Sequence, residues 1–416
     1  MELRVPLLMA LSAETRPSTR LQMCTGSALN RIRPSIVSER NRGGQLGLLA
    51  RRRRAILLAI ATSLLHAPLP GQTTATVSST VSCRPCRLEL VRVATLGDTG
   101  GPGEVHQQGV VSRDSRGRFF VTSNGDPSTV RVFNQDGRFL ASFGRTGAAP
   151  GEFTARPDLV MGPGDSLIAI DRAARRATVF DPEYRVARTI QLRAYSGDAI
   201  RLPDGRLVVT GNSRTAALIG LPLHLLDARG TLVRSFGSID ERVDLRDRFS
   251  MLRSIAPSAY GGIWSAKPNS YIIEKWDTTG SLRVRVERSA DWFRPWTRPQ
   301  GALGVTRQPP WLVDMAEHSD TLLVLIRVDD SEWQPRRTAP APGVPGEFWM
   351  PDADKELLYD TIVEVIDVKS GRLVVSQRFR QNLLGIVSAD MVASYEEDEQ
   401  GNPKYVVWRL NLLRPQ

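Results

Sequence analysis

Hydrophobic and polar positions alternate in short runs along residues 109–192, and one pattern occurs there twice in succession. Each copy has two apolar stretches joined by a turn with Gly or Asp, a polar loop, and a third apolar stretch that ends in Phe133-Asn or Phe180-Asp. Apolar runs of four to eight residues between Gly, Asn and Asp turns are the pattern of β-strands. The two copies therefore predict consecutive units of antiparallel strands, each closed by a hairpin to a fourth strand.

The pattern continues beyond these two copies with a regular period. The third strands are expected to end at Phe133, Phe180, Leu226 and Trp276, so the unit is about 46 to 50 residues long. Self-similarity at this period, with several short strands per unit, is typical of β-propeller blades. The first four blades are expected near residues 109–147, 157–192, 197–237 and 251–288.

The C-terminal part of the chain extends the ring and completes it. One further blade is expected at 311–379, with polar, Pro-rich insertions at 289–310 and 330–357. The last unit, 383–413, offers three strands, and the missing fourth is available at 87–97. Pairing the two ends of the chain in one blade would remove open sheet edges. The prediction is an all-β, six-bladed propeller over 87–413; seven blades, if the insertions hide one, or a sandwich are the alternatives.

The chain begins with a segment that does not fit the repeat. Residues 1–50 are rich in Arg and Ser without periodicity, which indicates a disordered leader or an overextended start. Residues 51–75 combine four arginines, an apolar run and a small-residue exit, the three parts of a signal peptide. The apolar run is shorter than the roughly twenty residues that span a bilayer. We expect cleavage between Ala67 and Ala75, export to the periplasm or beyond, and no transmembrane anchor afterwards.

The positive net charge of the chain belongs mostly to this leader. The chain carries +11 overall, and residues 1–72 hold eleven arginines against three glutamates, which leaves the remainder close to neutral. Nonspecific nucleic-acid binding needs clustered cations on the folded part, so a nucleic-acid partner is not expected.

Two cysteines follow the signal segment, Cys83 and Cys86. A zinc ribbon would need a second pair, a c-type haem would need His in place of Arg87, and a thioredoxin-like centre would need a βαβ context. In an exported protein a structural disulfide is favoured, and an exposed dithiol is the alternative.

The repeats resemble those of NHL-repeat propellers, and the chain also looks like the six-bladed propeller proteins that bacteria export. The resemblance rests on Phe119-Phe-Val-Thr-Ser, Val130-Arg-Val-Phe-Asn-Gln-Asp-Gly, Ser142-Phe-Gly and Pro150-Gly-Glu-Phe153. It is clear over two units, weaker over 197–288 and faint after 310. It implies a binding platform, and for a minority of such proteins a metal-dependent lyase or lactonase.

The residues favour the binding protein over the enzyme. Only His106, His224 and His318 remain after signal removal, none close in sequence to another ligand, and no Gly-x-Ser-x-Gly nucleophile motif is present. No cofactor or metal site is predicted from spacing. A Ca²⁺ ion held by carboxylates from several blades in the central channel stays open, because sequence spacing does not show which blades meet there.

Tryptophans in the insertions are the candidate ligand-binding residues. Trp292, Trp296, Trp333 and Trp349 lie in or beside the two insertions, several of them near arginines. Loops on a rigid scaffold often carry function, and aromatic rings provide stacking surfaces. The competing interpretation is that these rings anchor the long loops. The sequence thus predicts an exported scaffold for an unidentified protein or small molecule, with a channel-centred, metal-dependent lactonase or lyase as the alternative.

Overall fold

The computed structural model describes most of the chain from Thr73 onward. The described residues are 73–192, 197–211, 220–237, 251–259, 261–297, 306–334, 339–340, 348–349 and 358–414. The predicted leader at 1–50 and the predicted cleavage region up to residue 72 lie outside them. No helix in the described part is long and apolar enough to cross a membrane.

Six blades, each of four antiparallel strands, make up the fold, and the sheet of one blade carries an additional fifth strand. The innermost strands are β3 (Gly109–Arg113), β7 (Asp158–Met161), β11 (Ala199–Arg201), β15 (Ser254–Pro257), β19 (Trp311–His318) and β25 (Leu383–Ser388). The second strands are β4 (Phe119–Ser123), β8 (Leu167–Asp171), β12 (Leu207–Thr210), β16 (Ile263–Ala266), β20 (Thr321–Asp329) and β26 (Met391–Glu397). The third strands are β5 (Val130–Phe133), β9 (Arg176–Phe180), β13 (Leu223–Leu226), β17 (Ile272–Trp276), β23 (Tyr359–Asp367) and β27 (Pro403–Leu413). The outermost strands are β6 (Phe139–Phe143), β10 (Val186–Gln191), β14 (Leu232–Phe236), β18 (Leu282–Arg288), β24 (Arg372–Phe379) and β2 (Arg87–Leu96).

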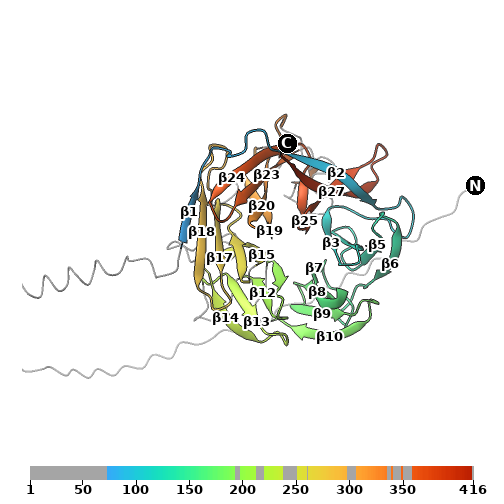
Figure 1. Cartoon of the computed structure of the whole chain (residues 1–416). Coiled ribbons are helices and arrows are strands. Elements are labelled where there is room, and N and C mark those ends of the chain that lie inside the picture. Colours follow the sequence, from blue (N-terminus) through green and yellow to red (C-terminus); the bar gives the residue numbers. More distant parts are fainter. Residues whose placement is uncertain are drawn as a thin grey trace, which may run out of the picture. The chain divides into compact units, whose positions relative to one another are not determined.

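The sheets are arranged as blades around a central axis (Figure 1). Each innermost strand contacts that of the next blade in chain order, and β25 contacts β3, which closes the ring. The remaining elements are a 3₁₀ turn at Pro163–Asp165 and the strands β1 (Thr73–Val77), β21 (Ala339–Pro340) and β22 (Phe348–Trp349). The predicted all-β, six-bladed propeller is confirmed.

The last blade combines a strand from the N-terminal part of the chain, β2, with the three C-terminal strands. β2 pairs antiparallel with β27 from Arg87 opposite Leu413 to Leu96 opposite Tyr405. Leu88, Ala94 and Leu96 are buried in this pairing. The predicted closure of the ring by an N-terminal strand is therefore confirmed, and it covers the edge that β27 would otherwise expose.

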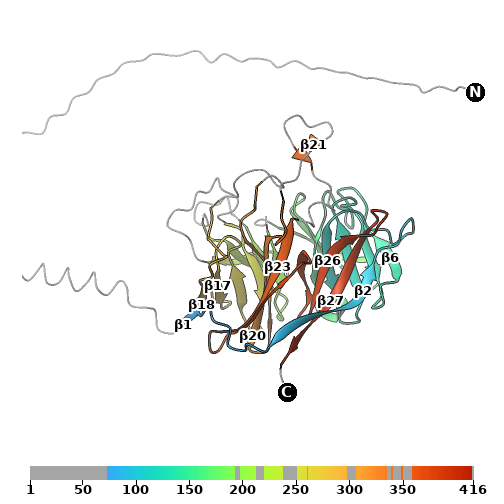
Figure 2. The same cartoon turned by 90° about the horizontal axis from the view of Figure 1, so that it is seen from above.

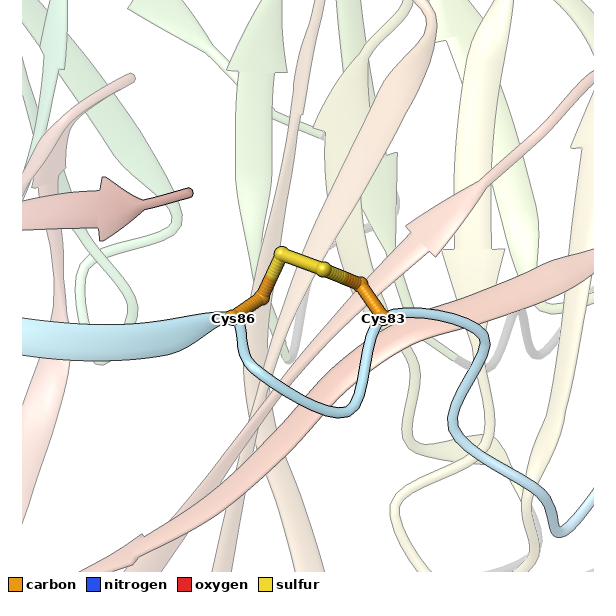
Figure 3. The surroundings of a disulfide bond; sticks show 2 residues. All are labelled: Cys83 and Cys86. Atoms are coloured by element: carbon orange, nitrogen blue, oxygen red, sulfur yellow. A yellow bond between two sulfur atoms is a disulfide. The ribbon is translucent and has the colours of Figure 1, made fainter. Parts of the chain in front are cut away.

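The segment ahead of β2 crosses the outer edges of two other blades. β1 pairs in parallel with β18 of the fourth blade, an addition that the sequence pattern did not predict. The backbone N–H groups of Ser82 and Cys83 then donate to the carbonyls of Leu373 and Val374 on β24. Cys83 and Cys86 are joined by a disulfide in the turn that leads into β2 (Figure 3). The N-terminal segment thus fastens three consecutive blades from outside.

The hairpins that join the third strand of a blade to the fourth share one pattern of hydrogen bonds. In four blades an Asp or Asn side chain at the start of this turn accepts the backbone N–H groups two and four residues later; these residues are Asn134, Asp181, Asp227 and Asp277. In the last blade Asp398 accepts the same two bonds in the turn between the second and third strands. The residue before the second donor has a positive φ, which favours glycine, as at Gly137. In the second blade Tyr184 takes this position, at φ 66°. Its ring stacks on Phe143, with centroids 5.1 Å apart, which compensates for the backbone conformation.

Both insertions emerge on the same face of the ring. The 289–310 segment connects an outermost strand to the next innermost strand, and the 330–357 segment connects a second strand to a third. In a propeller these two connections lie where the innermost strands begin. Figure 2 shows β21, which belongs to the second insertion, on the side opposite the C-terminus. We call the face where the innermost strands begin the insertion face.

Candidate functional site

A cavity of about 620 Å³ follows the axis of the ring. Residues from the innermost strands of all six blades line it. Most are aliphatic, and the charged lining residues are Arg156, Asp158, Arg172, Asp198, Asp314 and Glu317. A concave site with a few converging polar groups in an apolar wall is the usual form of a ligand pocket. The channel is therefore the candidate functional site.

Asp198 immediately precedes β11 and lies at the insertion-face end of that strand. Its backbone N–H donates to the hydroxyl of Thr210, at 2.7 Å, which fixes the start of the strand. The backbone N–H of Ile255, on the innermost strand of the next blade, donates to its carboxyl group. Burial, followed by the negative charge of Asp314, raises the pKa of Asp198 to about 7, although Arg172 opposes the rise.

Asp314 lies on β19, where the pairing with β20 is irregular. Its carboxyl group accepts the backbone N–H of Met315 and that of Ile386 on β25, both at 2.8 Å. Burial raises the pKa of Asp314 to about 6, partly offset by these two donors. Neither Asp314 nor Asp198 forms an ion pair with any described residue.

A third acid at this end is already neutralised. Asp158, which begins β7, pairs with the Nε of Arg172. Arg156, two residues earlier, has a buried Nη1 with no hydrogen-bond partner among the described residues. We call Asp158, Asp198 and Asp314 the acidic end of the channel. Two of its carboxyl groups, those of Asp198 and Asp314, are half-buried and form no ion pair with a described residue. Together with the unused donor of Arg156, they offer more hydrogen-bonding capacity than the fold itself employs.

Glu317 lines the channel further along β19, and its carboxylate already has a hydrogen-bond donor and a cationic partner. Its side chain is buried, accepts the backbone N–H of Ala259 at 2.6 Å and pairs with Lys275 at 3.4 Å. The Lys275 ammonium in turn lies 5.1 Å from the Trp264 ring centroid. This carboxylate serves to connect the fourth and fifth blades.

We expect the stability of the protein to fall as the pH rises from about 4 to about 7. Asp198 and Asp314 keep their protons in the folded protein up to about pH 7 and 6, whereas the unfolded chain loses them near 3.8. In that window the folded state binds more protons, so raising the pH favours unfolding. Melting temperatures of Asp198→Asn and the original protein at pH 5 and pH 8 measure this. The melting temperature of Asp198→Asn, relative to that of the original protein, should be higher at pH 8 than at pH 5. An equal difference in melting temperature between the two proteins at both pH values would contradict the assignment.

The predicted tryptophan site is spread over the insertion face. Trp292 packs against Tyr271 and Phe293 at the border of the core. Trp296 lies 5.4 Å from Trp311 between ring centroids, and its Nε1 donates to the carbonyl of Pro310 at 2.7 Å. These contacts anchor the first insertion to the ring, as the competing interpretation of these rings expects.

The other two tryptophans belong to the second insertion. The guanidinium of Arg307 lies 5.2 Å from the ring centroid of Trp333, which is half-buried. Trp349 lies in β22, opposite Ala339, and its side chain is outside the described residues. A ligand-binding role for these rings stays a prediction.

The described part of the chain contains no cluster of histidines or of other metal-binding side chains. His224 is buried, with its ring nitrogens 2.7 Å from the Ser235 hydroxyl and 3.0 Å from the Gly211 carbonyl. Burial lowers the pKa of His224, so the ring is a neutral structural bridge. Within the described residues, no group of three or more His, Cys, Asp or Glu is close enough to hold a metal ion.

The acidic end was not identifiable from the sequence. Asp198 and Asp314 are separated by more than a hundred residues and come from the third and fifth blades. Asp198 directly precedes an innermost strand and Asp314 lies within another, and the directions of their side chains are not readable from one chain.

Comparisons with known proteins agree with the fold. Residues 110–217 match the family model DUF5128, described as a 6-bladed beta-propeller. A solved structure of a protein from Bacteroides fragilis, described as exported, has TM-score 0.54 and 11% identity over 82% of this chain and 100% of that one. A member of the duf4221 family from Bacteroides vulgatus has TM-score 0.51 and 9% identity over 78% and 99%. No curated protein matches. These likenesses show the propeller; none singles out NHL repeats.

Proposed function

We propose that this chain is an exported binding protein that takes a small, positively charged ligand into the acidic end of its central channel. The observation that supports it is the cavity of about 620 Å³, in which the carboxyls of Asp198 and Asp314 lack a cationic partner among the described residues. Export is supported by the predicted signal segment and by the description of the Bacteroides fragilis neighbour.

Electrostatics determines the sign of the charge on the ligand. A carboxylate in an apolar wall is costly to ionise unless an opposite charge approaches, which is the situation that raises the pKa of both acids. A ligand ammonium would supply that charge and form charge-assisted hydrogen bonds. The unused Nη1 of Arg156 would donate to an acceptor on the same ligand. Because the cation displaces protons, binding should strengthen as the pH rises from 5 to 8.

Calorimetric titration of the purified protein with n-hexylamine tests this function, with n-hexanol as the uncharged analogue. We expect hexylamine to bind and hexanol not to bind. Loss of a charge-assisted hydrogen bond costs about 1.5–3 kcal/mol, so Asp198→Asn and Asp314→Asn should each weaken binding roughly tenfold or more. Asp136→Asn is the matched control, because Asp136 is an exposed carboxylate in the β5–β6 turn.

Two outcomes with the same purified protein would reject the proposal. Equal affinity of hexylamine for the original protein and for Asp198→Asn would place any binding outside the acidic end. Stoichiometric Ca²⁺ or Zn²⁺ in the purified protein, with a lowered melting temperature after chelation, would instead favour the metal-dependent lyase or lactonase.

A further inference from the structure

Three arginines at the insertion-face end of the fifth blade pair with carboxylates. The pairs are Arg307 with Asp329 at 3.7 Å, Arg378 with Asp360 at 2.8 Å and Arg380 with Glu332 at 2.6 Å. Arg327 lies on β20, two residues before the same end of the blade. It forms no ion pair with any residue that the structure describes. Arg327 therefore differs from its neighbours in lacking a negative partner.

The Arg327 guanidinium is held in place by two side chains and keeps donors to offer. Its Nε donates to Oδ1 of Asn382 at 3.1 Å, and its Cζ lies 5.1 Å from the ring centroid of Tyr359. An aromatic ring at this distance favours a fixed orientation of the guanidinium. Nη1 and Nη2 donate to no described residue and are not enclosed. The edge of the guanidinium that these two nitrogens form is thus available to a ligand.

The two side chains that hold Arg327 also have unused donors. Asn382 is buried directly ahead of β25, and its Nδ2 has no acceptor among the described residues. Tyr359 begins β23 and is half-buried, and its hydroxyl forms no hydrogen bond with a described residue. Because Arg327 contacts both side chains, donors from two blades meet at the junction of the fifth and sixth blades. We call Arg327, Tyr359 and Asn382 the Arg327 cluster.

The unpaired charge is unfavourable for the folded protein without a ligand. Arg327 is half-buried, and burial lowers its pKa; among the described groups, only Tyr359 acts in the opposite direction. Asp329, whose charge acts on Tyr359, is already occupied, because it accepts the backbone N–H of Gln308 at 2.8 Å and pairs with Arg307. An anion bound at the free edge of the guanidinium would offset the cost of removing this charge from water.

The charge of the cluster favours a monoanion. The cluster combines one positive charge with neutral donors, so a single negative charge balances it. The two oxygens of a carboxylate match the planar edge of a guanidinium and carry one charge between them. Inorganic phosphate at pH 8 is mostly a dianion, and part of its charge would stay uncompensated in a half-buried site.

We propose that the Arg327 cluster binds the carboxylate of a small organic acid. Nη1 and Nη2 of Arg327 bind the two oxygens, and the Tyr359 hydroxyl supplies a further donor. Leu323 and Leu325, which precede Arg327 on the same face of β20, belong to the apolar cluster between the fifth and sixth blades. The site shares no residue with the lining of the central channel, so it does not depend on the proposed function.

Calorimetric titration of the full protein with butyrate tests the proposal, with butyramide as the uncharged analogue and inorganic phosphate as the second anion, all at one ionic strength and pH 8. We expect butyrate to bind more tightly than phosphate, and butyramide not to bind. Arg327→Gln should weaken butyrate binding tenfold or more, and Tyr359→Phe about threefold. Arg327→Lys keeps the charge without the planar edge and should lie between Arg327→Gln and the original protein.

A matched control separates the site from the general charge of this face. Arg380→Gln removes the same charge from a surface pair nearby, where the arginine side chain is 77% exposed, and should leave butyrate binding unchanged. Without ligand, Arg327→Gln should melt no lower than the original protein, because it removes an unpaired charge.

Three results would overturn the proposal. Equal affinity of butyrate for the original protein and Arg327→Gln would place the anion elsewhere. Tighter binding of phosphate than of butyrate would reject the carboxylate. If neither anion binds and Arg327→Gln melts at a lower temperature, Arg327 serves only to connect the fifth and sixth blades through Asn382.

Discussion

Removal of residues 73–96 is expected to prevent the ring from folding into a soluble protein. The deletion takes away β2, which fills the outer position of the last blade and pairs with β27 over ten residues. Leu88 and Leu96 leave the core, and each buried leucine contributes about 1.5–3 kcal/mol. Together with the lost ladder of hydrogen bonds, the cost approaches the whole stability of a typical domain, about 5–15 kcal/mol.

The exposed edge is the second reason for this expectation. Without β2, the N–H and C=O groups of β27 along one side become a template for other chains, so the product should aggregate. Yield of soluble protein and size-exclusion elution measure the outcome. A deletion of 73–77 is the internal control, since it removes β1 alone and spares the ring closure. It should give soluble protein with a lower melting temperature, because Val77 is the one buried residue of β1.

Addition of a peptide with the sequence of 87–96 during refolding of the longer deletion sharpens the test. Recovery of soluble, cooperative protein would show that the strand itself is needed. A 73–96 deletion that remains soluble and melts near the temperature of the full chain would contradict the assigned role of β2.

The fold was predictable because each blade repeats local chemistry. An Asp or Asn at the end of a third strand, as at Asn134 and Asp277, accepts N–H groups across the turn, and this creates the period that is readable in the sequence. The exception at Tyr184 shows that the period tolerates a missing glycine when packing compensates. β1 escaped prediction because Thr73–Val77 is short, largely exposed and paired in parallel with a strand far along the chain.

The candidate site was much less predictable than the blades. A ring brings together residues that have no fixed spacing, so Asp198 and Asp314 give no motif. Trp296, a candidate from the sequence, makes local contacts that anchor its insertion, and its role in ligand binding stays a prediction.

Replacement of Glu364 by Gln is expected to destabilise the protein by about 3–5 kcal/mol, the usual cost of breaking one partner of a buried ion pair. Glu364 lies on β23 and is inaccessible to solvent. Its two oxygens accept Nε and Nη2 of Arg288, both at 2.9 Å. The hydroxyls of Tyr271, at 2.6 Å, and Ser376, at 2.8 Å, donate to the same carboxylate.

The arrangement explains why the loss is so large. Arg288 ends the outermost strand of the fourth blade, and its side chain is only 3% exposed. Once Glu364 is neutral, the guanidinium keeps its charge in a site that water does not reach. Tyr271, whose pKa burial and Glu364 raise well above 10, also loses a strong acceptor. Denaturant unfolding measured for Glu364→Gln and for the original protein gives the cost directly.

Two further variants separate the charge from the packing. Asp320→Asn breaks the surface pair with Lys369, whose side chain is 72% exposed, and should cost less than about 1 kcal/mol. The double variant Glu364→Leu with Arg288→Met removes both charges, and it should be more stable than Glu364→Gln because no unpaired ion remains buried. If the double variant is instead the least stable, the four hydrogen bonds carry the energy, and the junction between the fourth and fifth blades depends on polar geometry rather than on charge compensation.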